Sequence, residues 1–209
     1  CAGLAVMLVL NPNSVNPFEP VRDEMLTRAK VPMTKEEVRW VSVARLGVQP
    51  GDTVWDVGAG TGAVTFELAR KAMDGAVFAV ERNTEAIELI AQNRQKLGGF
   101  NVHIVPGHAP EVLADLPKPN CVFVGGSGGN MRKIIEIALM KNPKARIAVN
   151  AIALETLQET QRLFAEFGLQ QVEITQLSAA RGKSIGCYTM MTANNPVFIL
   201  SGKGDKNGE

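Results

Sequence analysis

The sequence predicts an α/β fold built on a mostly parallel β-sheet that helices cover on both faces. From residue 53 onward, short runs rich in β-branched residues alternate with longer stretches of helical period. The short runs are apolar at nearly every position, which is typical of strands buried on both faces of a parallel sheet. With 209 residues, the chain is long enough for one well-filled domain of this kind and little more.

The expected elements follow one another at regular spacing. Strands are predicted at 53–57, 76–81, 101–105, 121–125 and 146–150, with helices between them at 63–73, 84–97, 130–141 and 154–167. An earlier helix is expected to begin after Thr34, because Thr34 and Glu37 have the spacing of a capping box. After residue 168, two strands at 170–177 and 187–200 have no helix between them, so an antiparallel hairpin is expected to close the sheet. Seven strands, five parallel and then a reversed pair, resemble the layout of the Rossmann-like class I methyltransferase domain.

Three segments are expected along the chain. Residues 1–33 are predicted to form an N-terminal arm or linker, since residues 11–33 hold four of the eleven prolines and show no sustained period. Residues 34–201 form the predicted methyltransferase domain, and the polar residues 202–209 a disordered tail. The apolar run Leu4–Leu10 has two open interpretations: the last strand of an upstream domain, or a strand added to the edge of this domain's own sheet.

Composition and charge exclude several classes of function. A formal net charge of +1 gives no basic face for a nucleic acid, and no apolar run reaches the length of a membrane span. The cysteines, Cys1, Cys121 and Cys187, have neither paired nor CxxC spacing, which argues against a disulfide framework or a zinc site. We therefore expect a cytoplasmic protein with no bound metal and neither a nucleic-acid nor a membrane partner.

The glycine-rich stretch VWDVGAGTGA, residues 54–63, points to a bound cofactor. Its glycine spacing also satisfies the dinucleotide fingerprint, and Glu81 at the end of the next strand suits a ribose in either case. Asp56 separates the two interpretations, because a carboxylate there repels a pyrophosphate but attracts the ammonium and sulfonium charges of S-adenosylmethionine. A carboxylate that only braces the loop is the structural alternative for Asp56. The predicted S-adenosylmethionine site contains Asp56, Gly58, Ala59, Gly60, Thr61, Gly62 and Glu81.

The loop PGHAPE, residues 106–111, follows the third predicted strand, where this fold usually places its adenine-reading loop. Many members of the fold have Asp before the Ala, and His108 stands there in this chain. Adenine is then expected to be read by backbone groups near Ala109, with His108 either part of the site or a solvent-exposed loop residue.

Two loops are candidates for the substrate. VGGSGGN, residues 124–130, lies between a strand and a helix and offers a run of backbone N–H groups, so Gly126, Ser127 and Gly128 are predicted to cradle an anion. A tight turn that needs glycine for packing is the alternative. Arg181, in the stretch AARGK, is predicted to pair with substrate carboxylates, the alternative being a loop charge in solvent. The Asn/Asp-Pro-Pro-aromatic motif of enzymes that methylate base amines does not occur after the fourth strand.

The stretches VPMTKEEVR, DVGAGTG, PGHAPE, VGGSGGN, VNAIALET and ARGK…YTMM together resemble the decarboxylating precorrin methyltransferases of cobalamin biosynthesis, over residues 32–200. The resemblance implies methyl transfer from S-adenosylmethionine to carbon 15 of a precorrin or cobalt-precorrin, with loss of carbon dioxide from the acetate on carbon 12. It also implies a homo-oligomer, often a tetramer, and a carbon-5 methyltransferase domain that is either fused or separate. A fused domain of this kind, which some relatives have, would explain residues 1–10 as its remnant. Carried over by position, the family's donor site comprises Thr34, Gly58 to Gly62, Glu81 and Ala109.

No strong catalytic base is expected, because the reduced tetrapyrrole is an enamine-like carbon nucleophile and its conjugated ring accepts the electrons released by decarboxylation. Other functions remain open at this point. They are a class I methyltransferase with another small-molecule or RNA acceptor, a nicotinamide-dependent oxidoreductase, and a non-catalytic S-adenosylmethionine sensor. The sequence indicates neither whether the substrate contains cobalt nor the order of methylation and decarboxylation.

Overall fold

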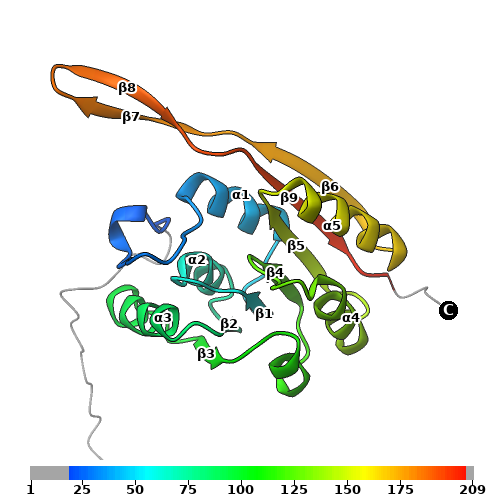
Figure 1. Cartoon of the computed structure of the whole chain (residues 1–209). Coiled ribbons are helices and arrows are strands. Elements are labelled where there is room, and N and C mark those ends of the chain that lie inside the picture. Colours follow the sequence, from blue (N-terminus) through cyan, green and yellow to red (C-terminus); the bar gives the residue numbers. More distant parts are fainter. Residues whose placement is uncertain (1–18, 206–209) are drawn as a thin grey trace, which may run out of the picture.

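The computed structural model describes residues 19–205, so the predictions for residues 1–10 lie outside the described residues. Its main sheet has seven strands in the order β3-β2-β1-β4-β5-β9-β6, and a separate two-stranded sheet pairs β7 with β8 (Figure 1). The main-sheet strands are β1 (Thr53–Val57), β2 (Ala76–Glu81), β3 (Val102–Pro106), β4 (Cys121–Val124), β5 (Arg146–Ala151), β6 (Gln170–Leu177) and β9 (Val197–Lys203). The helices are α1 (Glu36–Leu46), α2 (Ala63–Lys71), α3 (Thr84–Leu97), α4 (Met131–Lys141) and α5 (Leu154–Glu166), with short 3₁₀ turns η1 (Asp23–Met25) and η2 (Glu111–Asp115).

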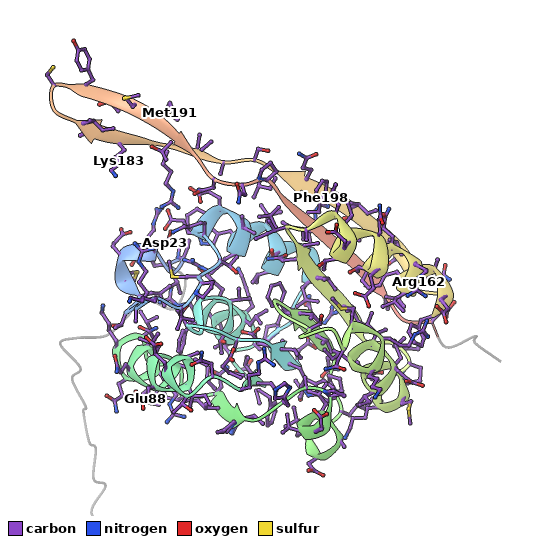
Figure 2. The ribbon with its side chains drawn as sticks, in the orientation of Figure 1. Asp23, Glu88, Arg162, Lys183, Met191 and Phe198 are labelled. Atoms are coloured by element: carbon purple, nitrogen blue, oxygen red, sulfur yellow. The ribbon has the colours of Figure 1, made fainter. Side chains whose placement is uncertain are left out.

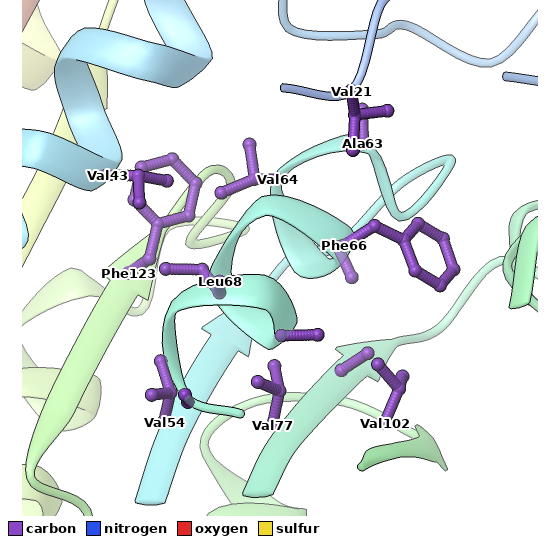
Figure 3. Packing of buried hydrophobic residues seen from close by; sticks show 14 of the residues in the cluster. Val21, Val43, Val54, Ala63, Val64, Phe66, Leu68, Val77, Val102 and Phe123 are labelled. Atoms are coloured by element: carbon purple, nitrogen blue, oxygen red, sulfur yellow. The ribbon is translucent and has the colours of Figure 1, made fainter. Parts of the chain in front are cut away.

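Helices cover both faces of the sheet, as the continuous apolar strands predict. Successive side chains of a strand point to opposite faces, so Val54 packs toward α1, α2 and α3 whereas Trp55 packs toward α4 and α5. Figure 3 shows the first of these cores, in which Leu68 and Phe66 of α2 lie over Val54 and other valines of the strands. The α/β class and the parallel order of β1 to β5 are thus confirmed.

The end of the chain differs from the prediction in its strand directions. β9 runs antiparallel to both of its neighbours, β5 and β6, so β6 has the same direction as β5. Only one strand of the main sheet is therefore reversed, not a pair. β9 also extends to Lys203, which places residues 202 and 203 of the predicted tail in the sheet, and residues 206–209 lie outside the described part.

The predicted strand at 187–200 is two strands, and the predicted loop around Arg181 is a third. β7 (Ala180–Ile185) and β8 (Tyr188–Ala193) pair with each other, and the Asn194-Asn195-Pro196 break then leads into β9. Proline cannot donate a backbone hydrogen bond, so it interrupts a strand that sequence pattern alone reads as continuous. Figure 1 shows this projecting hairpin, β7 with β8, extending from the main sheet beyond α1.

The capping-box prediction at Thr34 is wrong in position. The N-cap of α1 is Lys35, which makes no side-chain cap hydrogen bond, and the helix ends at a left-handed Gly47. Thr34 instead lies in the extended segment before the helix, where its backbone carbonyl accepts a hydrogen bond from Arg39 Nη1 at 2.6 Å. Within residues 19–205, no helix has both the length and the apolar character that crossing a bilayer requires.

Candidate functional site

A cavity of about 600 Å³ opens at the carboxyl ends of the parallel strands. The order of the strands reverses direction between β1 and β4, and in open α/β sheets this switch point is where ligands bind. Every predicted donor-site residue lines the cavity except Gly62, and the predicted substrate residues line it except Arg181. The lining members of the prediction are Thr34, Asp56, Gly58, Ala59, Gly60, Thr61, Glu81, Ala109, Gly126, Ser127 and Gly128.

The first glycine of the β1 loop brings two backbones into contact. Gly58 has φ +75°, and a Cβ there would lie 2.7 Å from the backbone oxygen of Gly126 in the loop after β4. Gly62 has a different purpose. A Cβ at Gly62 would lie 2.8 Å from the ring of Phe66, so this glycine permits the turn into α2 and its packing. The loop therefore combines one glycine for close approach inside the site with one for the fold.

Glu81 organises the rim of the cavity through backbone N–H groups. Its Oε2 accepts from Gly60 N at 2.8 Å, while its Oε1 accepts from Arg82 N at 2.8 Å and Asn83 N at 2.9 Å. A carboxylate has about four acceptor sites, so one remains for a hydroxyl group of a ligand. Glu81 thus holds the glycine loop in place and still has capacity for the predicted ribose contact.

Asp56 is the fully buried carboxylate at the floor of the cavity. Its Oδ2 accepts from Thr65 Oγ1 at 2.5 Å, whereas its Oδ1 has no hydrogen-bond partner among the described residues. Burial raises the pKa of Asp56 to about 7; the Thr65 hydrogen bond opposes this shift, and the charge of Glu81 adds to it. An unsatisfied buried carboxylate oxygen is costly unless a ligand or a cation compensates it.

The glycines of the β4 loop have separate explanations. Gly128 and Gly129 have φ of +56° and +85°, which favours glycine, and a Cβ at Gly125 would lie 3.2 Å from the oxygen of Gly58. The exception is Gly126, which has no positive φ and no atom within 4 Å of the point where a Cβ would stand. The turn explanation therefore covers three of the four glycines. Gly126 is the one whose missing side chain leaves open space in the cavity.

The segment before α1 covers the donor side of the cavity. This roof segment, residues 31–35, lines the cavity, and its Pro32 oxygen lies 3.4 Å from where a Cβ of Gly60 would stand. Asn93 of α3 fixes the preceding chain, because its Oδ1 accepts from Thr27 N at 2.7 Å and its Nδ2 donates to Thr27 O at 2.9 Å. Arg39, which is fully buried, holds the Thr34 carbonyl. Side chains of α1 and α3 therefore hold the roof segment and the chain before it by hydrogen bonds.

Arg181 lies outside the cavity, in contrast to its predicted place over the substrate. Its Nε and Nη2 donate to the two carboxylate oxygens of Glu37 at 2.6 and 2.8 Å, and its Nη1 donates to Asp23 Oδ2 at 3.3 Å. The Arg181 hydrogen bond lowers the pKa of Glu37. In this conformation Arg181 joins the projecting hairpin to α1 and η1, the region where Figure 2 labels Asp23 below the hairpin.

His108 is positioned by Arg82. The Arg82 Nη1 atom lies 3.0 Å from His108 Nε2, which places the two side chains together across the mouth of the cavity. Because a guanidinium can only donate, a hydrogen bond in this pair requires His108 Nε2 to be the acceptor. Neither interpretation of His108 made from the sequence included this pair.

Several lining residues were not among the predictions. The polar members of this set, with one exposed apolar residue, include Lys35, Arg82, Asn83, Asn150, Ile152, Asn194 and Asn195. Asn150 is at the carboxyl end of β5 and pairs with Ser42 Oγ at 2.9 Å. Asn150 and Ile152 could have been predicted from the sequence, because they lie at the carboxyl end of a parallel strand and ligands bind at that edge of the sheet. Asn194 and Asn195 lie at the strand break that the pattern did not predict.

The residues present fit a cationic, nucleoside-containing ligand. The buried oxygen of Asp56 lacks a partner, Glu81 has acceptor capacity for a hydroxyl, and the glycine loops leave backbone exposed to the cavity. Residues 19–205 hold no group of three or more His, Cys, Asp or Glu side chains positioned for a metal ion.

Comparison with known proteins assigns the domain. Residues 27–203 match the model of the precorrin methyltransferase domain. The chain belongs to this family. It is 42% identical over 184 residues to a probable cobalt-precorrin-6B C(15)-methyltransferase (decarboxylating) of Pyrobaculum calidifontis, with 87% of this chain and 94% of the relative covered.

Two solved structures of the family agree with the fold. The precorrin-6y C5,15-methyltransferase of Geobacter metallireducens matches with a TM-score of 0.83 and 34% identity, covering 88% of this chain and 96% of that one. The precorrin 8W decarboxylase of Methanobacterium thermoautotrophicum matches with a TM-score of 0.81 and 38% identity, covering 87% and 98%. This chain therefore has the same fold as these two solved structures over most of its length.

Proposed function

We propose that this protein transfers a methyl group from S-adenosylmethionine to carbon 15 of cobalt-precorrin-6B and removes the carboxyl group of the acetate on carbon 12. The observation that carries the proposal is the unpartnered, buried oxygen of Asp56 in a cavity whose wall also includes the β4 loop at Ser127 and Gly128. The first feature suits the positive charge of the donor, and the second suits a carboxylate of the acceptor. The family of the chain supports both assignments.

The donor side of the cavity binds and orients. S-adenosylmethionine supplies an electrophilic methyl group on a sulfonium. Asp56 places negative charge beside the ammonium and sulfonium region, and Glu81 accepts from one ribose hydroxyl group. The roof segment, residues 31–35, lines this side of the cavity. Alignment of sulfur, methyl and attacking carbon is the main catalytic contribution, and such alignment is worth roughly 7–11 kcal/mol.

The acceptor side needs no strong base. Carbon 15 of the reduced tetrapyrrole attacks the methyl group with its own electron pair; the new carbon–carbon bond forms as the carbon–sulfur bond breaks. Loss of carbon dioxide returns an electron pair to the ring and neutralises the charge that methylation left there. A proton shift within the product then completes the methyl group on carbon 12. The sequence predicts the backbone N–H groups of Gly126, Ser127 and Gly128 as partners of the substrate's carboxylates. The Gly126 N–H donates to Val57 O at 3.3 Å, so Ser127 and Gly128 are the partners that we propose.

A mass spectrum of the product tests this proposal. The protein is incubated with S-adenosylmethionine and either cobalt-precorrin-6B or its metal-free counterpart. A product that has gained one methyl group and lost one carbon dioxide is expected from the cobalt form. Turnover of the metal-free form alone would assign the protein to the other pathway branch. Binding of NADH in preference to S-adenosylmethionine would reject the methyltransferase assignment.

We further propose that the protein is a cytoplasmic homo-oligomer, a tetramer by family resemblance, in which the projecting hairpin contacts another copy. The hairpin exposes Ile185, Tyr188, Met190 and Met191, and Figure 2 shows Met191 far from the body of the molecule. An apolar strand pair exposed in this way favours association. Sedimentation of the full chain and of a Tyr188→Ser, Met191→Ser variant tests this. The variant is expected to sediment as a smaller species, and an unchanged mass contradicts the proposal.

A further inference from the structure

Two large apolar side chains are exposed shortly after β5, and the first of them lines the cavity. Ile152 lines the cavity and is 64% exposed, and Leu154, the first residue of α5, is 60% exposed. The residue before them, Ala151, is almost fully buried, so the change from core to surface occurs within one residue. The loop between β5 and α5 lies at the same edge of the sheet as the cofactor loops (Figure 1).

The apolar sequence of this loop lowers the stability of the first turn of α5. Ala153 is the N-cap of α5 and makes no side-chain cap hydrogen bond. Ser, Thr, Asp or Asn at an N-cap stabilises a helix by about 1 kcal/mol relative to Ala, so a polar loop would serve the fold better here. Exposure of Ile152 and Leu154 also leaves apolar area in water. Both features are explained if a ligand covers this loop.

The size of the cavity leaves most of the acceptor outside it. About 600 Å³ is in the range of about 300–1,000 Å³ that holds one drug-sized ligand, and the donor occupies the part under the roof segment. A tetrapyrrole macrocycle is wide, flat and apolar on its faces, with acidic side chains around its edge. Only the reacting edge near carbon 15 fits beside the donor, so a face of the ring must lie against the surface at the mouth.

We propose that Ile152 and Leu154 form an apolar platform for one face of the acceptor macrocycle. The inference rests on the proposed function and adds to it the place where the ring binds. The charges around the mouth complement the ring's acidic side chains, because Lys35 and Arg82 line the same cavity. The platform is therefore a determinant of acceptor affinity and specificity.

Serine substitutions in the full-length protein test the platform. Ile152→Ser, Leu154→Ser and the double variant are compared with wild type for the acceptor KM, for kcat and for the donor Kd by calorimetry. Each single change is expected to raise the acceptor KM about fivefold to tenfold, since each removes one partly buried aliphatic contact. The donor Kd and kcat at saturating acceptor are expected to stay within about twofold of wild type. Ile152→Leu, which keeps the apolar volume, is expected to retain most of the affinity.

Met140→Ser is the matched control. Met140 is 77% exposed on α4 and does not line the cavity, so its loss removes a comparable apolar side chain without touching the site. Its acceptor KM is expected to equal that of wild type. An unchanged acceptor KM in the double variant, an equal loss of donor affinity, or a changed oligomer mass would each overturn the platform.

The failure of the platform is distinguishable from that of the proposed function. Wild-type protein that methylates cobalt-precorrin-6B, together with a double variant of unchanged KM, rejects the platform alone. Wild-type protein that binds the donor but converts no corrin precursor rejects the proposed function and the platform with it.

Discussion

The donor side of the cavity and the projecting hairpin are built in opposite ways. Around the donor side, glycines bring backbones together, carboxylates such as Glu81 and Asp56 face inward, and the surrounding strands are buried. The hairpin, β7 with β8, is exposed along nearly its whole length and carries apolar side chains. The first region is packed around a cavity, whereas the second is joined to the rest of the chain through Arg181 and leaves its apolar side chains exposed.

Gly58→Ala is expected to have the largest effect. A Cβ at this position meets the Gly126 backbone at 2.7 Å, and the φ of +75° is unfavourable for alanine. Strain and overpacking of this kind cost about 3 kcal/mol in total. The unfolding midpoint should fall by several degrees and the donor Kd should rise more than tenfold. Thermal unfolding and calorimetry measure the two.

Gly51→Ala is the control for that change. Gly51 has no atom within 4 Å of a Cβ and no positive φ, so both quantities are expected to stay at the wild-type values. Equal behaviour of the two variants would mean that the contact between the β1 and β4 loops does not hold the donor side together.

Asp56→Asn is expected to weaken donor binding and to remove the loss of stability that ionisation of this buried carboxyl group causes. The pKa of Asp56 is about 7 in the folded protein, against an ordinary value of 3.8, so the folded state binds this proton more tightly than the unfolded state. Stability from this group is complete below pH 4 and is lost as the pH rises to 7, by about 4 kcal/mol at most. The variant does not titrate there, so it should become more stable than wild type as the pH rises from 4 to 7.

Donor binding gives the second half of this test. The cationic donor favours the ionised carboxylate, so the wild-type donor Kd should fall as the pH rises towards 7 and level off above it. In the Asp56→Asn variant the donor Kd should be higher than in wild type and independent of pH over that range. A wild-type Kd that does not change with pH would show that Asp56 only braces the loop through Thr65.

Arg181 connects the two regions, and its removal should have a smaller effect. Arg181→Ala breaks the contacts to Glu37 and Asp23, and because the side chain is partly exposed the cost is about 1 kcal/mol. Asp23 also pairs with Arg39 at 2.7 Å, which holds Thr34, so hydrogen exchange of residues 19–35 should increase and the donor Kd should rise a few-fold.

Arg45→Ala is the control for this ion-pair cluster. The Arg45 side chain pairs at 2.6 Å with Glu173 on the exposed surface, away from the roof segment, and such a pair contributes about 0–1 kcal/mol. Exchange in residues 19–35 is expected to stay unchanged. A loss of acceptor affinity with normal donor binding in Arg181→Ala would instead restore the substrate contact predicted from the sequence.

Much of the donor side could be predicted from the sequence because it is local. Asp56, Gly58 and Glu81 lie at the ends of strands whose apolar pattern is unambiguous, and parallel strands bring those ends together. The place of Arg181 could not be predicted in the same way. It depends on β7 being a strand and on Glu37, a residue 144 positions away, pairing with it. The β7 sequence has no buried face, so it lacks the alternation that identifies strands.

Gly126→Ala should have the smallest effect on the fold, so it separates a role in acceptor binding from a role in stability. No atom lies within 4 Å of the new Cβ and the φ is not positive, so the unfolding midpoint should stay within about 1 °C of wild type. The donor Kd should also be unchanged. The methyl group would, however, occupy cavity space beside Ser127 and Gly128, so the acceptor KM should rise several-fold. Steady-state kinetics with varied acceptor measure this, and an unchanged KM would leave the β4 loop as a turn that needs glycine only at Gly125, Gly128 and Gly129.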